Sequence, residues 1–460
     1  MDPPKSKGTS MDDALTLTET GCFHYLILLC GGLVFLACGL QNGINAYILP
    51  SCKCDFNLSS AQMGLLNALF LIGGISSAFF NGALADSLGR RPAMVGTLLA
   101  DAICSLLAAV APNFAVLGIL RFASGFLIGG PAAIIFLYLS EYLPIAKRPP
   151  YILLVGLFWT ISWMLLPGLA WVIIPAEWPM QLPIPLSPWR IFIGLMVFPS
   201  LVAALFVWKM PETPHYLYSR GHSQEALEII KNIYVMNTGK SGKDFPVKVL
   251  QEPAGAGEGI PPSKSAAMTA VRVLKGQLTS LFTPPVLSRT MIGLVAVFCN
   301  MFTYYGLALW LPELISRFEA HHTLFPNRTM TMCELTRVWQ DELVEAMSEA
   351  NATGAIVGEM DADAACRAAA VNEDVFIQTL IISAVCLVAN IVSAFIASRL
   401  HRKTMPISLN LFGAGLVVGV YFVNSSKTVL IVASLFQAAM NTGNTAINGL
   451  MVDLFPSNVR

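Results

Sequence analysis

The sequence predicts an all-α membrane protein, and two properties of the chain lead to this fold class. Apolar residues make up 55% of its 460 positions and charged residues only 12%, whereas soluble domains carry roughly 25% charged residues. Ten mostly apolar stretches are each long enough to cross a bilayer, which takes about 20 residues. Because the bilayer core contains no water to satisfy exposed backbone groups, such spans form helices.

We expect these helices at 25–48, 63–84, 93–111, 115–138, 151–174, 190–209, 289–311, 375–397, 406–424 and 428–450. Residues 1–24 then form a polar N-terminal tail, and residues 211–288 form a long loop. The positive-inside rule places the N-terminus in the cytosol, because the short outer loops carry only Lys53 and Lys427. The short inner loops carry Arg90, Arg91, Lys147, Arg148, Arg399, Arg402 and Lys403.

Four N-x-S/T sequons support this orientation, because glycans are attached on the outer or lumenal side of a membrane. The predicted topology places all of them on outer loops. They are Asn57, Asn327, Asn351 and Asn424. We therefore expect glycosylation at these positions.

The cytosolic central loop, 211–288, contains a predicted amphipathic helix, HSQEALEIIKNIYVMNTG. Its apolar side chains recur at helical spacing on one face, and Gly239 is a plausible residue for ending it. The helix lies either against the membrane surface or against the rest of the protein. A stretch rich in proline and glycine, EPAGAGEGIPPS, follows it and argues against further regular structure.

The outer loop, 316–374, is acidic, with eleven Asp or Glu residues against four Arg. It contains Cys333 and Cys366, which face an oxidising compartment in this topology, so we expect a disulfide between them. Cys52 and Cys54 lie on the first outer loop and are free to pair elsewhere.

An internal repeat is visible in two short motifs. GALADSLGRRP, from residue 82, matches AFIASRLHRKT, from residue 394. EYLPIAKR, from residue 141, matches DLFPSNVR, from residue 453. Both offsets, 394 − 82 and 453 − 141, are 312 residues. Two separate motifs that share one offset indicate two homologous halves, a plan typical of secondary transporters.

The repeat defines an N-terminal six-helix half at 25–210 and a C-terminal half at 289–460. The second half holds only four of the six expected spans. We therefore expect two further helices beyond Arg460, so that about ten of twelve are present here.

Three motifs resemble those of the major facilitator superfamily. GALADSLGRR covers Gly82 to Arg91, RFASGFLIGG begins at Arg121, and PETPHYL begins at Pro211. Over roughly residues 25–460 the chain resembles more specifically the synaptic vesicle glycoprotein 2 family and its insect relatives. The stretches that carry this likeness are YILPSCKCDFNLSS, GLFWTISWMLLPGLAWVIIP, SPWRIFIGLMVFPS and TYYGLALWLPEL. The resemblance implies a major facilitator fold of two pseudo-symmetric halves.

The resemblance also implies a conformational latch at the predicted cytosolic ends of the helices. We expect Asp86 to cap the neighbouring helix and the Arg90–Arg91 pair to bridge the two halves. The latch residues are Gly82, Asp86, Gly89, Arg90, Arg91, Glu141 and Arg148.

Polar side chains line one helical face of three spans, at i, i+4 and i+7 spacing. In the superfamily these spans line the central cavity, so we expect a substrate cavity here. Hydrogen bonding between helices is the alternative role for such residues. The predicted cavity residues are Asn42, Asn45, Asn300, Tyr304, Gln437, Asn441, Asn444 and Asn448. Two roles are open for three tryptophans, which either line the same cavity or pack elsewhere. They are Trp159, Trp163 and Trp310.

Two charges, Asp101 and Arg121, fall inside predicted spans, where ionisable residues are rare and usually functional. They form a structural pair, or Asp101 carries a proton; the sequence leaves both open. The first span, LACGLQNGIN, has no acidic residue, which favours uniport over proton coupling.

These observations predict a monomeric secondary transporter of a small organic solute that works by alternating access in the plasma or a vesicle membrane. The alternative is a non-transporting vesicle glycoprotein that binds partners or regulates trafficking. A net charge of zero gives no electrostatic footprint for nucleic acid. No His or Cys spacing suits a metal, so we expect no metal, no cofactor and no enzymatic activity. The expected partners are the solute and the lipid bilayer.

Overall fold

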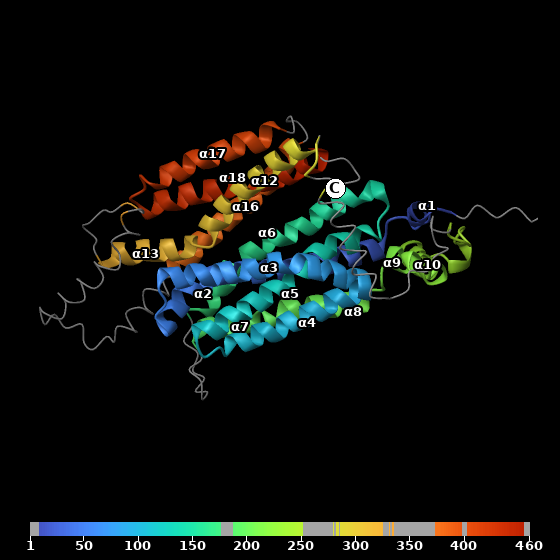
Figure 1. Ribbon diagram of the computed structural model, residues 1–460, viewed down its shortest axis with the longest axis horizontal. Coiled ribbons are helices and arrows are strands. Elements are labelled where there is room, and N and C mark those ends of the chain that lie inside the picture. Colours follow the sequence, from blue (N-terminus) through green and yellow to red (C-terminus); the bar gives the residue numbers. More distant parts are fainter. Residues whose placement is uncertain are drawn as a thin grey trace, which may run out of the picture. The chain divides into compact units, whose positions relative to one another are not determined.

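The computed structural model describes residues 9–175, 187–251, 286–324, 373–397 and 403–454, with the single positions 279, 282–284, 331 and 334. The long helices are α2 (Cys22–Phe56), α3 (Ser60–Leu88), α4 (Arg90–Ala109), α5 (Phe114–Ser140), α6 (Arg148–Ile173), α12 (Leu287–Ala308), α13 (Leu311–Leu324), α16 (Glu373–Ala397), α17 (Thr404–Val420) and α18 (Ser426–Leu454) (Figure 1). The sixth predicted span is divided between α7 (Pro188–Leu195) and α8 (Val197–Lys209). The short helices are α1 (Met11–Thr16), α9 (Pro214–Ser219) and α10 (Ser223–Thr238).

Eight segments within the described ranges are helical, long and apolar enough to cross a membrane. They coincide with the first eight predicted spans. Helix α17 is apolar but shorter, and α18 is 29 residues long with polar side chains along its second half. The chain is therefore a multi-pass membrane protein of the all-α class, as predicted.

Two helices continue past the predicted ends of their spans. Helix α2 extends to Phe56, so Cys52, Lys53 and Cys54 lie in its last turns and not on an outer loop, where the sequence analysis placed them. Helix α13 extends to Leu324, so the predicted outer loop 316–374 is helical at its start.

Ion pairs explain why charged residues are accommodated in these helix ends. Lys53 Nζ lies 3.7 Å from Glu313 Oε1 in α13. Arg317 Nε lies 2.9 Å from the same oxygen. The Glu313 side chain is 4% exposed, so its charge is balanced by two cations. A prediction from hydropathy alone ends both spans too early, because it counts each charged residue as unpaired.

The described residues form two compact units. The first contains the described residues that fall within 1–42, 68–162 and 193–271, and the second contains those within 43–67, 163–192 and 272–460. In the first unit α4 packs against both α5 and α8 (Figure 1). A large apolar core joins helices of this unit, with Ile27, Val34, Leu98, Ile135 and Val155 fully buried.

Glycines allow α3 and α5 to approach closely in the first unit. A Cβ added at Gly125 of α5 would lie 2.0 Å from the carbonyl oxygen of Phe70 in α3. One added at Gly73 of α3 would lie 2.2 Å from the carbonyl oxygen of Phe122 in α5. Backbone contact through small residues is a common way for membrane helices to pack.

In the second unit α18 packs against α12, α16 and α17. An apolar cluster joins α13, α16 and α18, with Ile315, Phe318, Ile382 and Val429 among its buried members. This cluster holds α18, and a smaller one, Tyr304 with Phe436 and Met440, joins α12 to it.

The predicted amphipathic helix is confirmed as α10, and Gly239 ends it in the left-handed conformation, at φ 70°. Its apolar face is covered by another helix. Leu227, Ile230 and Tyr234 pack with Ala14 and Leu15 of α1. The N-terminal segment therefore folds onto the segment that follows α8.

Candidate functional site

The turn between α3 and α4 is a single residue, Gly89. Its φ of 106° and ψ of 159° are open essentially only to glycine. A Cβ at this position would also lie 2.4 Å from Glu212 Oε2. The backbone conformation therefore requires glycine here, and a side chain would also displace the Glu212 carboxylate. The motif GALADSLGRR thus gains a physical reason for its second glycine.

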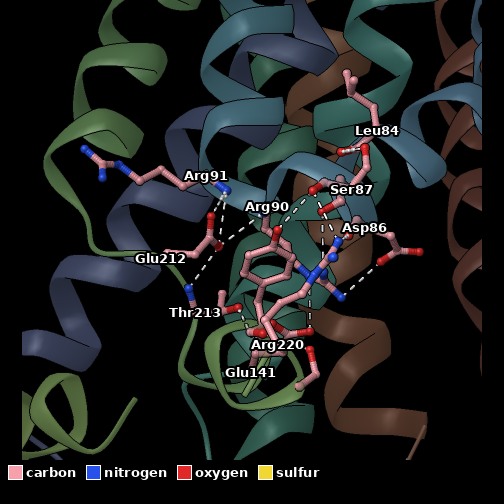
Figure 2. Close-up of polar contacts among 12 residues, drawn as sticks. Leu84, Asp86, Ser87, Arg90, Arg91, Glu141, Glu212, Thr213 and Arg220 are labelled. Carbon is pink, nitrogen blue, oxygen red and sulfur yellow. Dashed lines mark hydrogen bonds and ion pairs between the residues drawn. The ribbon is translucent and has the colours of Figure 1, made fainter. Parts of the chain in front are cut away.

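Glu212 caps the N-terminus of α4. Its Oε1 accepts a hydrogen bond from the backbone N–H of Arg90 at 3.2 Å, and its Oε2 accepts one from Arg91 N–H at 3.1 Å (Figure 2). A carboxylate is favourable at this end, where free N–H groups and the helix dipole both attract negative charge. Burial raises the pKa of Glu212, while the hydrogen bonds from Thr213, Arg91 and Arg90 lower it. The capping residue thus comes from the PETPHYL motif.

The prediction that Asp86 caps the neighbouring helix is wrong. No side chain of the turn itself caps α4, and the Asp86 side chain is 73% exposed, with Oδ1 3.2 Å from Arg90 Nη2. Asp86 belongs to the last turn of α3, so it pairs along the chain while Glu212 reaches the N–H groups.

Arg90 connects several elements of this site. Its Nε lies 3.4 Å from Glu141 Oε1 at the end of α5, and its guanidinium carbon lies 5.1 Å from the centre of the Tyr216 ring in α9. Figure 2 shows the Arg90 guanidinium with its two acidic partners, Asp86 and Glu141. One arginine therefore links the α3–α4 turn to α5 and α9.

The segment 211–220 is held by further hydrogen bonds. Tyr138 and Tyr142 each donate from Oη to the carbonyl oxygen of Pro211 at 2.7 Å. Arg220 Nη2 donates to the carbonyl oxygen of Asp86 at 2.6 Å (Figure 2). These bonds explain how Glu212 is positioned accurately at α4.

Five predicted latch residues therefore meet in one cluster: Asp86, Gly89, Arg90, Arg91 and Glu141. Two do not. Gly82 has no atom within 4 Å of where a Cβ would stand, and Arg148 pairs with Asp12 of α1 at 3.3 Å. Sequence reasoning missed Glu212 and Arg220, although the PETPHYL motif marked this segment.

A second polar cluster surrounds Asp101, which is fully buried. Ser124 Oγ donates to its Oδ1 at 2.5 Å. Ser200 Oγ and Gln41 Nε2 donate to its Oδ2 at 2.9 Å and 3.2 Å. Four helices, α2, α4, α5 and α8, therefore meet at one carboxylate.

Arg121 joins the same cluster through Gln41. Its Nη1 donates to Gln41 Oε1 at 2.9 Å and its Nη2 donates to the Gln41 carbonyl oxygen at 2.8 Å. The guanidinium also stacks on Phe70, 4.6 Å from the ring centre. Gln41 thus lies between the two buried charges. Ser124 follows Arg121 by three residues, a spacing on one helical face that marks it in the sequence.

A cavity of about 200 Å³ lies within the first unit, between α2, α3, α5 and α6. The predicted cavity residue Asn42 lines it, as does Trp159. The Asn42 Oδ1 atom is buried and has no hydrogen-bond partner among the described residues. Asn42 therefore lines the cavity, while its Oδ1 atom itself is shielded from it.

Other predicted cavity residues engage helix backbones or side chains. Asn45 Nδ2 donates to the Leu66 carbonyl oxygen at 3.2 Å. Asn300 Nδ2 donates to Asn410 Oδ1 at 3.2 Å, linking α12 to α17. These contacts favour the alternative role, hydrogen bonding between helices.

The remaining cavity predictions fall in the second unit. Tyr304 is 7% exposed and its ring centre lies 6.4 Å from that of Trp163. Gln437 is buried, and Asn441 and Asn444 are half-buried on α18. The side chain of Asn448 lies outside the described residues.

Of the outer-side predictions, Asn57 and Asn424 are exposed. Asn327, Asn351, Cys333 and Cys366 lie outside the described residues. Glycosylation at all four asparagines and the expected disulfide stay predictions. Cys54 is disulfide-bonded, and Cys52 is free. Across the described ranges, no three His, Cys, Asp or Glu side chains are grouped to hold a metal ion.

Comparison with known proteins gives three findings. Residues 18–317 match the family described as sugar (and other) transporter. Human synaptic vesicle glycoprotein 2B is 29% identical over 316 residues, which is 65% of this chain and 46% of that protein. Rat synaptic vesicle glycoprotein 2A is 27% identical over 318 residues, 65% of this chain and 43% of that protein. The chain thus spans less than half the length of these curated relatives.

Among solved structures, the partially occluded inward-open xylose transporter XylE of E. coli superposes with a TM-score of 0.63 at 16% identity, over 94% of this chain and 88% of that one. A bacterial homologue of the human lysosomal transporter Spinster gives 0.55 at 14% identity, over 96% and 77%. At these identities the likeness establishes a shared fold.

Proposed function

Because the chain belongs to the sugar (and other) transporter family and has the major facilitator fold, we propose that it is a secondary transporter that moves a small organic solute by alternating access. The observation that carries this proposal is the contact between Glu212 and the N-terminus of α4. It ties the α3–α4 turn to the segment after α8, at the predicted cytosolic ends of both helices.

Alternating access needs contacts that form in one conformational state and break in the other. The two states must also differ little in free energy. The cluster around Arg90 suits this purpose. The Asp86 side chain is 73% exposed, and an exposed ion pair contributes about 0–1 kcal/mol. A carboxylate at a helix N-terminus contributes about 0.3–2 kcal/mol. Contacts of this strength stabilise one conformational state of the transporter while leaving the other state accessible.

The cluster around Asp101, which lies within the membrane spans, has contacts that are far more costly to break. Asp101 and Arg121 are 0% and 1% exposed, and separating buried charges from their partners costs about 3–5 kcal/mol. We therefore assign Asp101, Gln41 and Arg121 to the rigid part of the first unit. The ends of the helices, rather than this buried network, change partners during transport.

Reconstitution in proteoliposomes tests the proposal. We expect a panel of labelled, uncharged and weakly charged solutes to include at least one that accumulates above empty liposomes. Glu212→Gln should slow this uptake several-fold, while Glu225→Gln, at an exposed acid of α10, should leave it unchanged. A broad panel with no uptake, using protein shown to be folded, would contradict the proposal.

A second function is favoured by the relatives, which are named as synaptic vesicle glycoproteins. In this version the protein lies in the plasma or a vesicle membrane and its exposed sequons, Asn57 and Asn424, carry glycans that affect sorting. Asn57→Gln with Asn424→Gln would then redistribute the protein between membranes while Glu212→Gln would not. The transport proposal predicts instead that Glu212→Gln slows uptake, while Asn57→Gln with Asn424→Gln leaves uptake unchanged.

A further inference from the structure

The guanidinium of Arg91 makes no ion pair within the described part of the chain. The backbone N–H of Arg91 donates to Glu212, but the side chain does not, and its Nη2 donates instead to the carbonyl oxygen of Trp208. Figure 2 shows the Arg91 side chain directed away from Asp86, the exposed partner of Arg90. The other N–H groups of this guanidinium are therefore available to a ligand.

A second cation lies beside Arg91. Lys209 is the last residue of α8 and directly follows Trp208, whose carbonyl oxygen accepts from Arg91. Lys209 is exposed, and it too makes no ion pair with a described residue. Two neighbouring like charges repel, and an anion between them removes that repulsion. A phosphate suits both groups, because guanidinium and ammonium are the usual phosphate ligands of proteins.

Helices α4 and α8 present apolar faces along their length. In α8 exposed apolar side chains recur every three or four residues, which places them on one helical face. They are Phe198, Leu201, Leu205 and Trp208. Helix α4 shows the same spacing in its exposed Leu99, Ile103 and Leu106. Because both helices are long and apolar enough to cross a membrane, we expect acyl chains to cover these faces.

The order of these groups along α8 matches the order of groups in a phospholipid. The bond from Arg91 to the Trp208 carbonyl oxygen joins the start of α4 to the end of α8, so both cations lie at one end of the helix pair. Trp208 is 59% exposed and lies between Lys209 and the apolar residues of α8. Tryptophan prefers the boundary between headgroups and acyl chains. A cation, an indole and an apolar face therefore follow one another, as phosphate, glycerol ester and acyl chain do in the lipid.

We propose that the predicted cytosolic end of the α4–α8 pair binds an anionic phospholipid, with its phosphate between Arg91 and Lys209 and its acyl chains along the exposed faces of the two helices. Anionic lipids are concentrated in the cytosolic leaflet, which is the leaflet that the predicted topology assigns to this end. A zwitterionic lipid also has a phosphate, but its own cation offsets the charge. The site therefore selects headgroups of net negative charge, and this inference does not depend on transport.

Native mass spectrometry of the full chain in detergent tests the proposal, with phosphatidylglycerol and phosphatidylcholine of identical acyl chains as probes. We expect the first phosphatidylglycerol to bind about twentyfold more tightly than phosphatidylcholine, at about fivefold for each nearby cation. Lys209→Gln, which breaks no ion pair of the described residues, should reduce this preference about fivefold. Lys248→Gln is the control, at an exposed lysine of the same unit, and should leave the preference unchanged.

Arg91 needs two variants, because its guanidinium also bonds to α8. Arg91→Lys keeps the charge and should keep the preference for phosphatidylglycerol within about threefold. Arg91→Gln should reduce the preference about fivefold, and Arg91→Gln with Lys209→Gln should bind the two lipids equally. Thermal unfolding in the same detergent shows whether each variant is folded. If Arg91→Gln unfolds, Lys209→Gln and Arg91→Lys still decide the question.

A soluble competitor distinguishes a lipid from a free phosphate compound. Glycerophosphoglycerol has the headgroup of phosphatidylglycerol without its acyl chains, and we expect it not to displace the lipid at equal concentration. Displacement would assign the two cations to a soluble anion and overturn the lipid assignment. Equal affinity of the wild type for the two lipids, or an unchanged preference in Lys209→Gln, would also overturn the inference.

Discussion

The backbone N–H of Arg91 lies 3.1 Å from Glu212 Oε2 although 121 residues separate them in the chain. The same carboxylate also receives the N–H of Arg90. One acid from the segment after α8 therefore caps α4, and its carboxylate lies where a side chain at position 89 would stand. The first three predictions concern this relationship.

Removing the cap should destabilise the first unit in proportion to what is lost. Glu212→Ala leaves the N–H groups of Arg90 and Arg91 without their acceptor, so we expect a loss of about 1–3 kcal/mol in the free energy of unfolding. Glu212→Gln keeps an oxygen acceptor and removes a charge whose burial is unfavourable, so we expect the free energy of unfolding to change by less than ~1 kcal/mol in either direction. Chemical denaturation in detergent measures both. Glu225→Ala is the control, and an equal loss there would contradict the cap.

Gly89→Ala should be more harmful than the same change at another glycine of positive φ. Gly221 has φ 86° and no atom within 4 Å of a Cβ, so Gly221→Ala meets only backbone strain, about 1–2 kcal/mol. Gly89→Ala adds the collision with Glu212. We expect it to unfold at a lower temperature than Gly221→Ala and to slow uptake. Equal unfolding temperatures would show that the collision is relieved without loss.

Lowering the pH should increase the free energy of unfolding, because Glu212 becomes protonated. Burial raises the pKa of this carboxyl above its ordinary 4.5. A group with a higher pKa in the folded state binds its proton more tightly there, so its contribution is complete below about 4.5 and is lost as pH rises through the raised pKa.

The wild type should therefore gain stability relative to Glu212→Gln as pH falls through the interval just above 4.5. Denaturation of both proteins between about pH 4 and about pH 7 measures the difference. A difference that is flat, or that shrinks on acidification, would mean that the hydrogen bonds to Glu212 outweigh its burial.

Asp101 should behave as a structural group. Asp101→Leu leaves Arg121 buried with one charge partner fewer, and we expect a loss of about 3–5 kcal/mol. The double variant Asp101→Leu with Arg121→Leu should recover much of that loss, because no charge then remains buried. If Asp101 carried a proton instead, Asp101→Asn would fold normally and remove the pH dependence of uptake.

The contact between α3 and α5 should be intolerant of a single methyl group. Gly125→Ala places a carbon 2.0 Å from the Phe70 carbonyl oxygen, so we expect the helices to separate at a loss of about 1–3 kcal/mol. Gly74→Ala, which meets nothing closer than 3.6 Å, should be nearly neutral. Thermal unfolding of the two variants in one detergent compares them directly.

Several elements follow from the sequence because the forces that form them are local. The membrane helices are recognisable from stretches of apolar residues, and α10 from the spacing of its apolar face and from Gly239. The α3–α4 turn follows from GALADSLGRR, since its residues are neighbours in the chain. The ends of α2 and α13 were misplaced because the pairing of Lys53 with Glu313 joins residues far apart.

The sequence by itself thus determined that the chain spans a membrane as helices, since hydropathy and helical spacing are properties of consecutive residues. Only the tertiary structure decided which polar groups meet: Glu212 rather than Asp86 at α4, and Gln41 between Asp101 and Arg121. The physical reason is that a buried polar atom must find a partner within about 3 Å, and that partner comes from whichever helix packs beside it.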